Sequence, residues 1–144
     1  MFDGSPRDSR WVEARVDLAA IRHNVGVMRA LVAPAAVWAV VKADGYGHGA
    51  VPAARAVMAG GAEGLCVALA QEGVELRDAG IDAPILLLSE QPSSQLDSVV
   101  ANRLIPTLYS IGAVRAMTDA VTRAGRSGYP VQIKVDTEIG RAHV

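Results

Sequence analysis

Cysteine is scarce in this sequence, with Cys66 the single one among 144 residues. One cysteine excludes an internal disulfide, and one thiol does not by itself make a metal site. Cys66 lies in the apolar run LCVAL at residues 65–69. We therefore expect a buried core thiol and no metal centre.

Aromatic residues and charge of one sign are also sparse. Aromatics make up 4% of the chain, and 14 basic residues oppose 15 acidic ones for a net charge of −1. This excludes the basic, aromatic surface that nucleic-acid binding favours. No apolar run approaches the ~18 residues of a membrane span. The polar segment 1–10 offers no apolar stretch for a signal peptide. We therefore expect a cytoplasmic protein without nucleic-acid or membrane partners.

Apolar residues, by contrast, are abundant at 51%, enough for the core of one domain. Residues 11–16 alternate like a half-exposed strand. Asp17 is placed to cap a helix whose apolar residues recur every three or four positions up to Leu31. Residues 37–41 are apolar at successive positions, which predicts a strand covered on both faces.

This alternation of strand and helix continues to the end of the chain. Further strands are predicted at residues 65–69, 85–88, 105–109 and 131–135, and helices at 51–59, 70–79, 95–102 and 111–124. Such spacing is typical of right-handed βαβ units and a parallel sheet. A flavodoxin-type open sheet of five strands would be complete at this length. A (β/α)₈ barrel needs about 250 residues and would be present only in part. Hydrophobic periodicity alone does not distinguish the open sheet from the partial barrel.

The segment most informative about chemistry is VVKADGYGHG at residues 40–49. Lys42 ends a buried strand, and barrel enzymes place catalytic groups at the C-terminal ends of their strands. An amine partly removed from water is disfavoured in its charged form and is more nucleophilic toward an aldehyde. The three glycines that follow allow a tight turn and a close approach to a ligand. A lysine that merely reaches solvent where a strand ends is the structural alternative.

This segment resembles the pyridoxal-phosphate attachment motif of the alanine racemases. The resemblance extends from about Trp11 to Thr137 and includes VDLAAIRHNV at residues 16–25 and DAPILLL at residues 82–88. It favours a partial (β/α)₈ TIM-like barrel of about five parallel strands, preceded by an N-terminal strand. It also implies that residues 11–137 are the N-terminal part of this barrel and that the family's C-terminal β domain is absent.

The resemblance implies roles for individual residues. Lys42 matches the lysine that binds pyridoxal phosphate and acts as one of two racemising bases, and Tyr46 matches the tyrosine that holds the cofactor phosphate. Leu88 aligns with an apolar cofactor contact, although a plain core leucine is an equal interpretation. His48 matches the motif too, but shaping the turn is its more favoured role.

The segment IKVDT at residues 133–137 resembles the KVDTG segment of the family. There the lysine matching Lys134 is often carbamylated and orients an arginine seven positions on, which reaches the substrate carboxylate. Arg141 stands at that position. The second base of the family is a tyrosine from the C-terminal domain of the partner subunit, and no residue here is assigned to it.

The last seven residues depart from the family pattern, since Glu138 stands where the family has glycine. We interpret residues 138–144 as a non-native, adapter-derived tail, in which case Arg141 occupies its position by coincidence. The chain would then be a truncated, inactive fragment with exposed sheet edges.

The expected function of the full-length enzyme is interconversion of L-alanine and D-alanine in a cytoplasmic homodimer, supplying D-alanine for peptidoglycan. One alternative is a racemase for another small amino acid such as serine. Another is a non-catalytic pyridoxal-phosphate carrier, which lacks the YGHG continuation. A nucleotide-binding module is disfavoured, because neither GxGxxG nor GxxxxGK[ST] occurs.

Overall fold

The computed structural model describes residues 14–135, which alternate between helices and short parallel strands. The elements, in chain order, are α1 (Leu18–Val32), β1 (Trp38–Val40), α2 (Lys42–Gly47), α3 (Ala50–Ala59), β2 (Gly64–Val67), α4 (Ala70–Asp78), β3 (Ile85–Leu87), the 3₁₀ helix η1 (Ser93–Gln95), α5 (Leu96–Ala101), β4 (Thr107–Leu108), α6 (Ile111–Arg123) and β5 (Gln132–Ile133).

The strands are neighbours in sequence order. β1, β2 and β3 form one parallel sheet in which β2 is central, and β4 pairs in parallel with β5. Ile105 joins the two sheets, since its N–H donates to Ile85 O and its carbonyl accepts from Leu87 N, both at 2.8 Å. The five strands therefore follow one another in the order 1-2-3-4-5.

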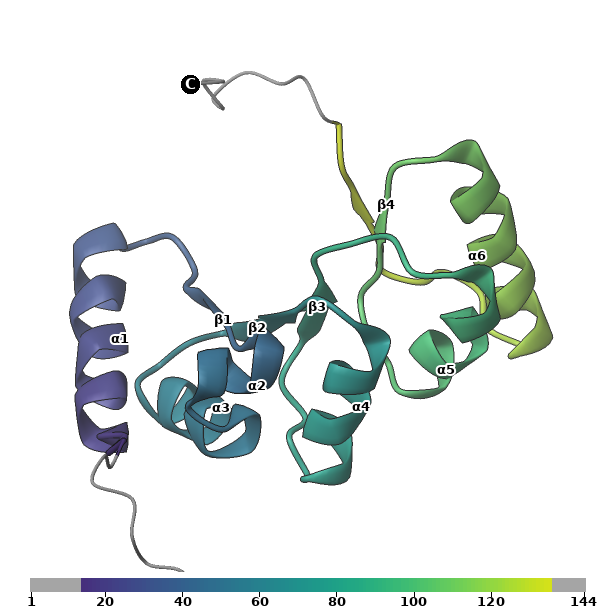
Figure 1. Ribbon diagram of the computed structural model, residues 1–144. Coiled ribbons are helices and arrows are strands. Elements are labelled where there is room, and N and C mark those ends of the chain that lie inside the picture. The colour runs from purple at the N-terminus through teal and green to yellow at the C-terminus, as the bar shows by residue number, and fades with distance from the viewer. Residues whose placement is uncertain (1–13, 136–144) are drawn as a thin grey trace, which may run out of the picture.

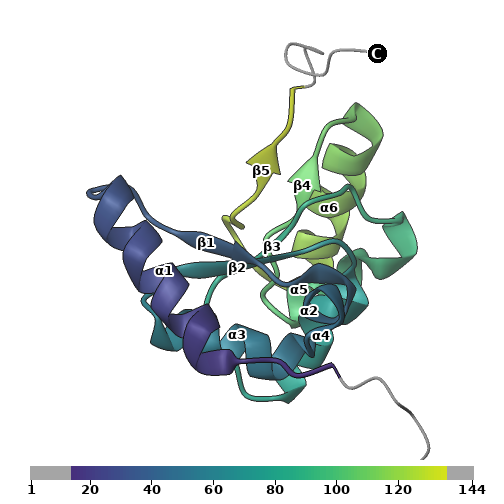
Figure 2. The same ribbon diagram turned by 60° about the vertical axis from the view of Figure 1, so that its left-hand side comes forward.

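This order separates the two architectures that hydrophobic periodicity left open, and of which the family resemblance favoured the barrel. A flavodoxin-type sheet has the order 2-1-3-4-5 and carries helices on both faces. Here the crossover helices α3, α4, α5 and α6 all lie on one side of the strands, and β4 and β5 curve away from the line of β1–β3 (Figures 1 and 2). Sequential strands with helices outside are the arrangement of a (β/α)₈ barrel, so the predicted partial barrel is confirmed.

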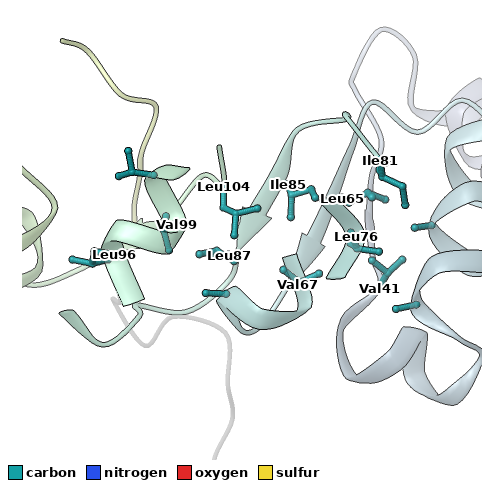
Figure 3. Close-up of a cluster of buried hydrophobic side chains, with 14 of the residues drawn as sticks. Val41, Leu65, Val67, Leu76, Ile81, Ile85, Leu87, Leu96, Val99 and Leu104 are labelled. Carbon is teal, nitrogen blue, oxygen red and sulfur yellow. The ribbon is translucent and has the colours of Figure 1, made fainter. Parts of the chain in front are cut away.

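The core lies between the strands and these helices. Buried strand residues such as Leu65, Val67 and Ile85 form one apolar cluster with the helix residues Leu76 and Val99 (Figure 3). Each of these five side chains is fully enclosed, and burial of an aliphatic side chain of this size contributes roughly 1.5–3 kcal/mol. This layer therefore holds the strand ends in place.

The opposite face of the strands is less well covered than the sequence predicts. The apolar run at residues 37–41 indicates a strand enclosed on both sides, but Trp38 and Val40 are each 39% exposed, whereas Val41 on the helical side is 3% exposed. In a closed barrel this inner face is covered by the other strands across the interior. Within residues 14–135 five strands are present, and they leave that face open.

The N-terminal prediction was half right. Asp17 caps α1 as expected, since its Oδ1 accepts from the N–H groups of Ala19 at 2.9 Å and Ala20 at 3.0 Å. The strand expected at residues 11–16 is not seen in its described part, since residues 14–16 belong to neither of the two described sheets. A strand forms only where a neighbour satisfies its backbone groups. Residues 11–13 lie outside the described range.

Candidate functional site

Lys42 is the second residue after β1, at the C-terminal end of the strand, and the first residue of α2. The preceding residue, Val41, still belongs to the sheet pattern, because its N–H donates to Cys66 O at 2.9 Å. Lys42 is half-buried, and its Nζ lies 6.0 Å from the centre of the Tyr46 ring. This distance is at the limit of a cation–π interaction, so the ring lies beside the amine. The predicted strand-end position of Lys42 agrees with the structure.

The turn after Lys42 is left-handed. Ala43, Asp44, Gly45 and Tyr46 all have φ between 51° and 61° and ψ between 35° and 54°. For residues other than glycine this conformation costs roughly 1–2 kcal/mol each. Such strain is retained where surrounding contacts over-determine the backbone, and it concentrates at functional sites. The glycines of the sequence predicted a turn, but they did not predict that Ala43, Asp44 and Tyr46 would also be left-handed.

Several hydrogen bonds hold this turn. Asp44 Oδ1 accepts from Ala50 N at 2.7 Å, which ties the turn to the start of α3. His48 Nδ1 lies 2.8 Å from Gly45 O. His48 therefore contacts the backbone of the turn, which is the role that the sequence favoured for it.

A second part of the barrel mouth is an open cavity of ≈850 Å³ beyond the ends of β3, β4 and β5. Its walls include Leu88, Tyr109 and Lys134, and the Nζ of Lys134 lies 5.9 Å from the centre of the Tyr109 ring. Lys42 and Tyr46 do not line this cavity, although they lie at the same edge of the strands. The structure thus brings Leu88 and Lys134 together, and keeps Lys42 with Tyr46 at the end of β1. Arg141 lies outside the described residues.

Three polar side chains that the sequence did not single out connect the loops at this edge. Glu72, at the start of α4, accepts from Ala43 N in the turn after β1. Gln91, after β3, accepts from Ala70 N at 3.0 Å and donates to Ala68 O at 3.0 Å, both after β2. A glutamate at the third position of a helix is a recognisable capping signal, so Glu72 could have been noted from the sequence. The hydrogen bond from Ala43 to Glu72 could not be predicted in this way, because the two residues are distant in sequence.

Glu90 makes the third connection. Its Oε2 accepts from the N–H groups of Tyr109 at 2.9 Å and Ser110 at 3.1 Å, and its Oε1 accepts from Ser110 Oγ at 3.0 Å. The hydrogen bond from the Tyr109 backbone, with those from Ser110, lowers the pKa of Glu90 below its ordinary value of 4.5. The carboxylate is therefore charged at neutral pH and holds the loop after β4 to the loop after β3.

Other kinds of site find no support in residues 14–135. Cys66 is buried, and its burial raises the pKa of the thiol, which disfavours the reactive thiolate. No group of three or more metal-ligating side chains occurs in the described part. Among the described helices, none has both the length and the apolar character that a membrane crossing needs.

The fold and the site together define a class: the first part of a parallel α/β barrel with a lysine at the end of its first strand, on a glycine-rich turn. Residues 16–142 match the family model of the alanine racemase N-terminal domain. The chain therefore belongs to this family, and the resemblance seen in the sequence is confirmed.

Similar proteins agree with this assignment. The chain is 42% identical over 136 residues to an alanine racemase of Thermobifida fusca (strain YX) and 43% identical over 137 residues to one of Synechocystis sp.. In both cases the match covers 94% of this chain and 36% of the relative. Solved structures of alanine racemases from E. faecalis and from Streptomyces coelicolor A3(2) superpose with TM-scores of 0.80 and 0.78, at 38% and 41% identity. Each superposition covers 88% of this chain and 34% of the other, so the chain spans about a third of the proteins it matches.

Proposed function

We propose that this chain is the N-terminal part of a pyridoxal-phosphate-dependent alanine racemase, with Lys42 as the residue that holds the cofactor. The observation that carries the proposal is the position of Lys42: a half-buried amine at the end of β1, followed by a strained left-handed turn, in a chain of this family. Strain of this kind is maintained at sites where geometry matters for chemistry.

The residues at the barrel mouth suit pyridoxal phosphate in their chemistry. Lys42 supplies the primary amine that the aldehyde of this cofactor requires. Tyr46 is 59% exposed, so its hydroxyl is free to donate to a phosphate oxygen. Leu88 is 36% exposed and offers apolar surface to an aromatic ring. The glycines of the turn allow the backbone to lie close to a ligand.

Each residue then has a defined task. When bound, pyridoxal phosphate supplies the sink for the electron pair left at the substrate Cα. The Lys42 amine removes or returns the Cα proton on one face of the substrate. The substrate carboxylate is bound by an arginine seven positions after Lys134, in the planar geometry that a guanidinium provides, and Lys134, carbamylated, orients this arginine. Arg141 fills this role if residues 138–144 are native. The acid/base for the opposite face comes from the C-terminal domain of a partner subunit, so the proposal requires a homodimer.

The proposal extends to the organisation of the chain. Residues 11–137 are the barrel part, residues 138–144 are a non-native tail, and Arg141 belongs to the site only if that tail is native. The full-length enzyme is cytoplasmic and produces D-alanine for peptidoglycan. The 144-residue chain on its own is inactive, because the second base and most phosphate contacts are supplied by other parts of the enzyme.

The test of Lys42 uses the full-length protein, expressed from the complete reading frame that contains these residues. Reduction with borohydride in the presence of pyridoxal phosphate, followed by peptide mapping, should place the pyridoxyl group on Lys42. The same protein should racemise L-alanine, as measured by chiral chromatography. The Lys42→Arg variant should lose both the pyridoxyl label and the racemase activity, because a guanidinium does not replace the amine.

The matched control is Lys134→Arg, which changes the other lysine of the barrel mouth. It should keep the pyridoxyl group on Lys42. A label on Lys134 or elsewhere, in place of Lys42, would contradict the assignment. Racemisation of serine in preference to alanine would retain Lys42 but reject the proposed substrate.

A further inference from the structure

The side chain of Glu72 connects two strand-end loops through both of its carboxylate oxygens. Oε1 accepts from Ala43 N at 2.6 Å, and Oε2 accepts from Ala68 N at 2.7 Å and Leu69 N at 2.9 Å. Glu72 is half-buried at the third position of α4, which follows β2. Hydrogen bonds to a charged acceptor are about twice as strong as neutral ones, so this link is a firm one.

The hydrogen bond between Glu72 and Ala43 matters because of where Ala43 lies. Ala43 follows Lys42 directly and is the first residue of the left-handed turn, with φ 51°. On the other side of Lys42, Val41 donates its N–H to Cys66 O in β2. Both backbone neighbours of Lys42 are therefore held in place, Val41 by β2 and Ala43 by α4, and only the contact of Ala43 depends on a side chain.

We propose that Glu72 is a positioning residue, which fixes the direction in which the Lys42 side chain leaves the end of β1. This proposal rests on the function proposed for Lys42. The carboxylate favours the left-handed conformation of Ala43 by accepting its N–H, and so offsets part of the strain of the turn. Without it, the segment after Val41 can relax toward right-handed conformations, and the amine moves.

Helix capping alone does not explain these contacts. A cap of α4 needs only the reach back to Leu69, the residue before the helix, and Leu69 itself has no side-chain acceptor. Oε2 alone meets that need, because it accepts from Leu69 N and also from Ala68 N. The other oxygen turns to Ala43, 29 residues away in sequence. The capping role therefore accounts for Oε2, and the positioning role for Oε1.

Four variants of the full-length protein separate the two roles. Glu72→Gln replaces one acceptor oxygen by an NH₂ group, which opposes a backbone N–H. Glu72→Asp keeps the charge near α4 but is too short to reach both loops. Glu75→Gln removes an exposed carboxylate from the same helix. Gln91→Ala weakens the start of α4 from its other side, since the hydrogen bonds of Gln91 go to Ala68, Ala70 and Ser89.

Two readouts are decisive, besides the melting temperature. The first is amide hydrogen exchange at Ala43 in the cofactor-free protein, and the second is the pyridoxal-phosphate concentration that gives half-maximal pyridoxyl labelling of Lys42 after reduction. In Glu72→Gln and Glu72→Asp we expect both to rise about tenfold, the effect of losing one charged hydrogen bond. Glu75→Gln should change neither. Gln91→Ala should lower the melting temperature and leave both readouts near wild type.

Exchange at Ala43 that stays slow in both Glu72 variants would overturn the proposal. So would an equal increase in Gln91→Ala, since that would assign the effect to α4. Fast exchange with unchanged labelling would show that the link exists but does not position Lys42, and would also reject the proposal. If wild-type protein is not labelled at Lys42, the proposed function fails, whereas the exchange result still decides whether Glu72 holds the turn.

Discussion

At the scale of single residues, the turn at Lys42 shows how a local cost is compensated by contacts from elsewhere. Gly45 is buried within it at φ +61°, and a Cβ built there would lie 3.3 Å from Ala53 Cβ and 3.5 Å from Ala50 Cα in α3. The turn therefore fits between β1 and α3 because this position has no side chain. The left-handed conformation and the close packing both favour glycine here.

Gly45→Ala should lower the free energy of unfolding by about 1–2 kcal/mol, since it adds left-handed strain and a tight contact. It should also raise the cofactor concentration needed to label Lys42. Urea denaturation and borohydride labelling check the two effects. Gly80→Ala is the control, because Gly80 has a similar φ of +79° with open space around it, at the end of α4. The control should lose stability without altering the labelling, and an equal change in labelling would contradict the expectation.

At the scale of elements, hydrophobic periodicity located the described helices well. α1, α3, α4 and α6 begin and end within one residue of the predicted helices. α2 was missed, because a left-handed turn has no hydrophobic period. The strand predicted at residues 105–109 is shorter than expected: β4 is two residues long, and Ile105 joins the neighbouring sheet through an isolated bridge. Pro106, which has no N–H to donate, lies between these two parts.

Tyr129 shows how an irregular segment is tied to these elements. Its hydroxyl lies 3.0 Å from both Val99 O and Leu104 O, and so connects the stretch before β5 to α5 and to the loop that follows it. Burial raises the pKa of Tyr129 above its ordinary value of 10.0, although nearby Arg126 and Arg77 act in the opposite direction. The protonated hydroxyl is thus the form that the folded state prefers.

Tyr129→Phe should lower the free energy of unfolding by about 1 kcal/mol at neutral pH, since it removes the donor from two carbonyls. Because the folded pKa is raised, the contribution of the hydroxyl is present below pH 10.0 and is lost as the pH rises through the folded value. The difference between wild type and variant should therefore shrink above pH 10.0. Urea denaturation of the full-length protein at pH 7 and above pH 10.0 measures it, and a difference independent of pH would contradict this account.

At the scale of the whole molecule, the described part of the chain has an inner face and a first helix with uncovered apolar groups. Ile133 on β5 is 61% exposed, Val135 just after β5 is 77% exposed, and Leu31 on α1 is 74% exposed. α1 has no buried residue along its length. Exposed apolar surface of this extent favours association with further polypeptide.

The 144-residue chain alone should therefore bind a hydrophobic dye and self-associate, and it should not racemise alanine. Dye fluorescence, analytical ultracentrifugation and chiral chromatography measure these three properties. The full-length protein serves as the control, and it should bind less dye per mole and form a defined dimer. A monodisperse 144-residue chain without dye binding, or one with racemase turnover, would refute this expectation.

The sequence by itself determined the order of helices and strands, the place of Lys42 at a strand end, and the family. These are local properties, because periodicity, capping residues and a ten-residue motif are read over short stretches of chain. Periodicity alone left an open sheet and a barrel equally possible, and the family resemblance favoured the barrel. The tertiary structure showed the barrel directly, since strand order and the side taken by the helices depend on pairing between distant segments. It also decided how Lys42 is held: the link from Glu72 to Ala43 spans 29 residues, and its hydrogen bond exists only when two loops meet at one edge of the barrel.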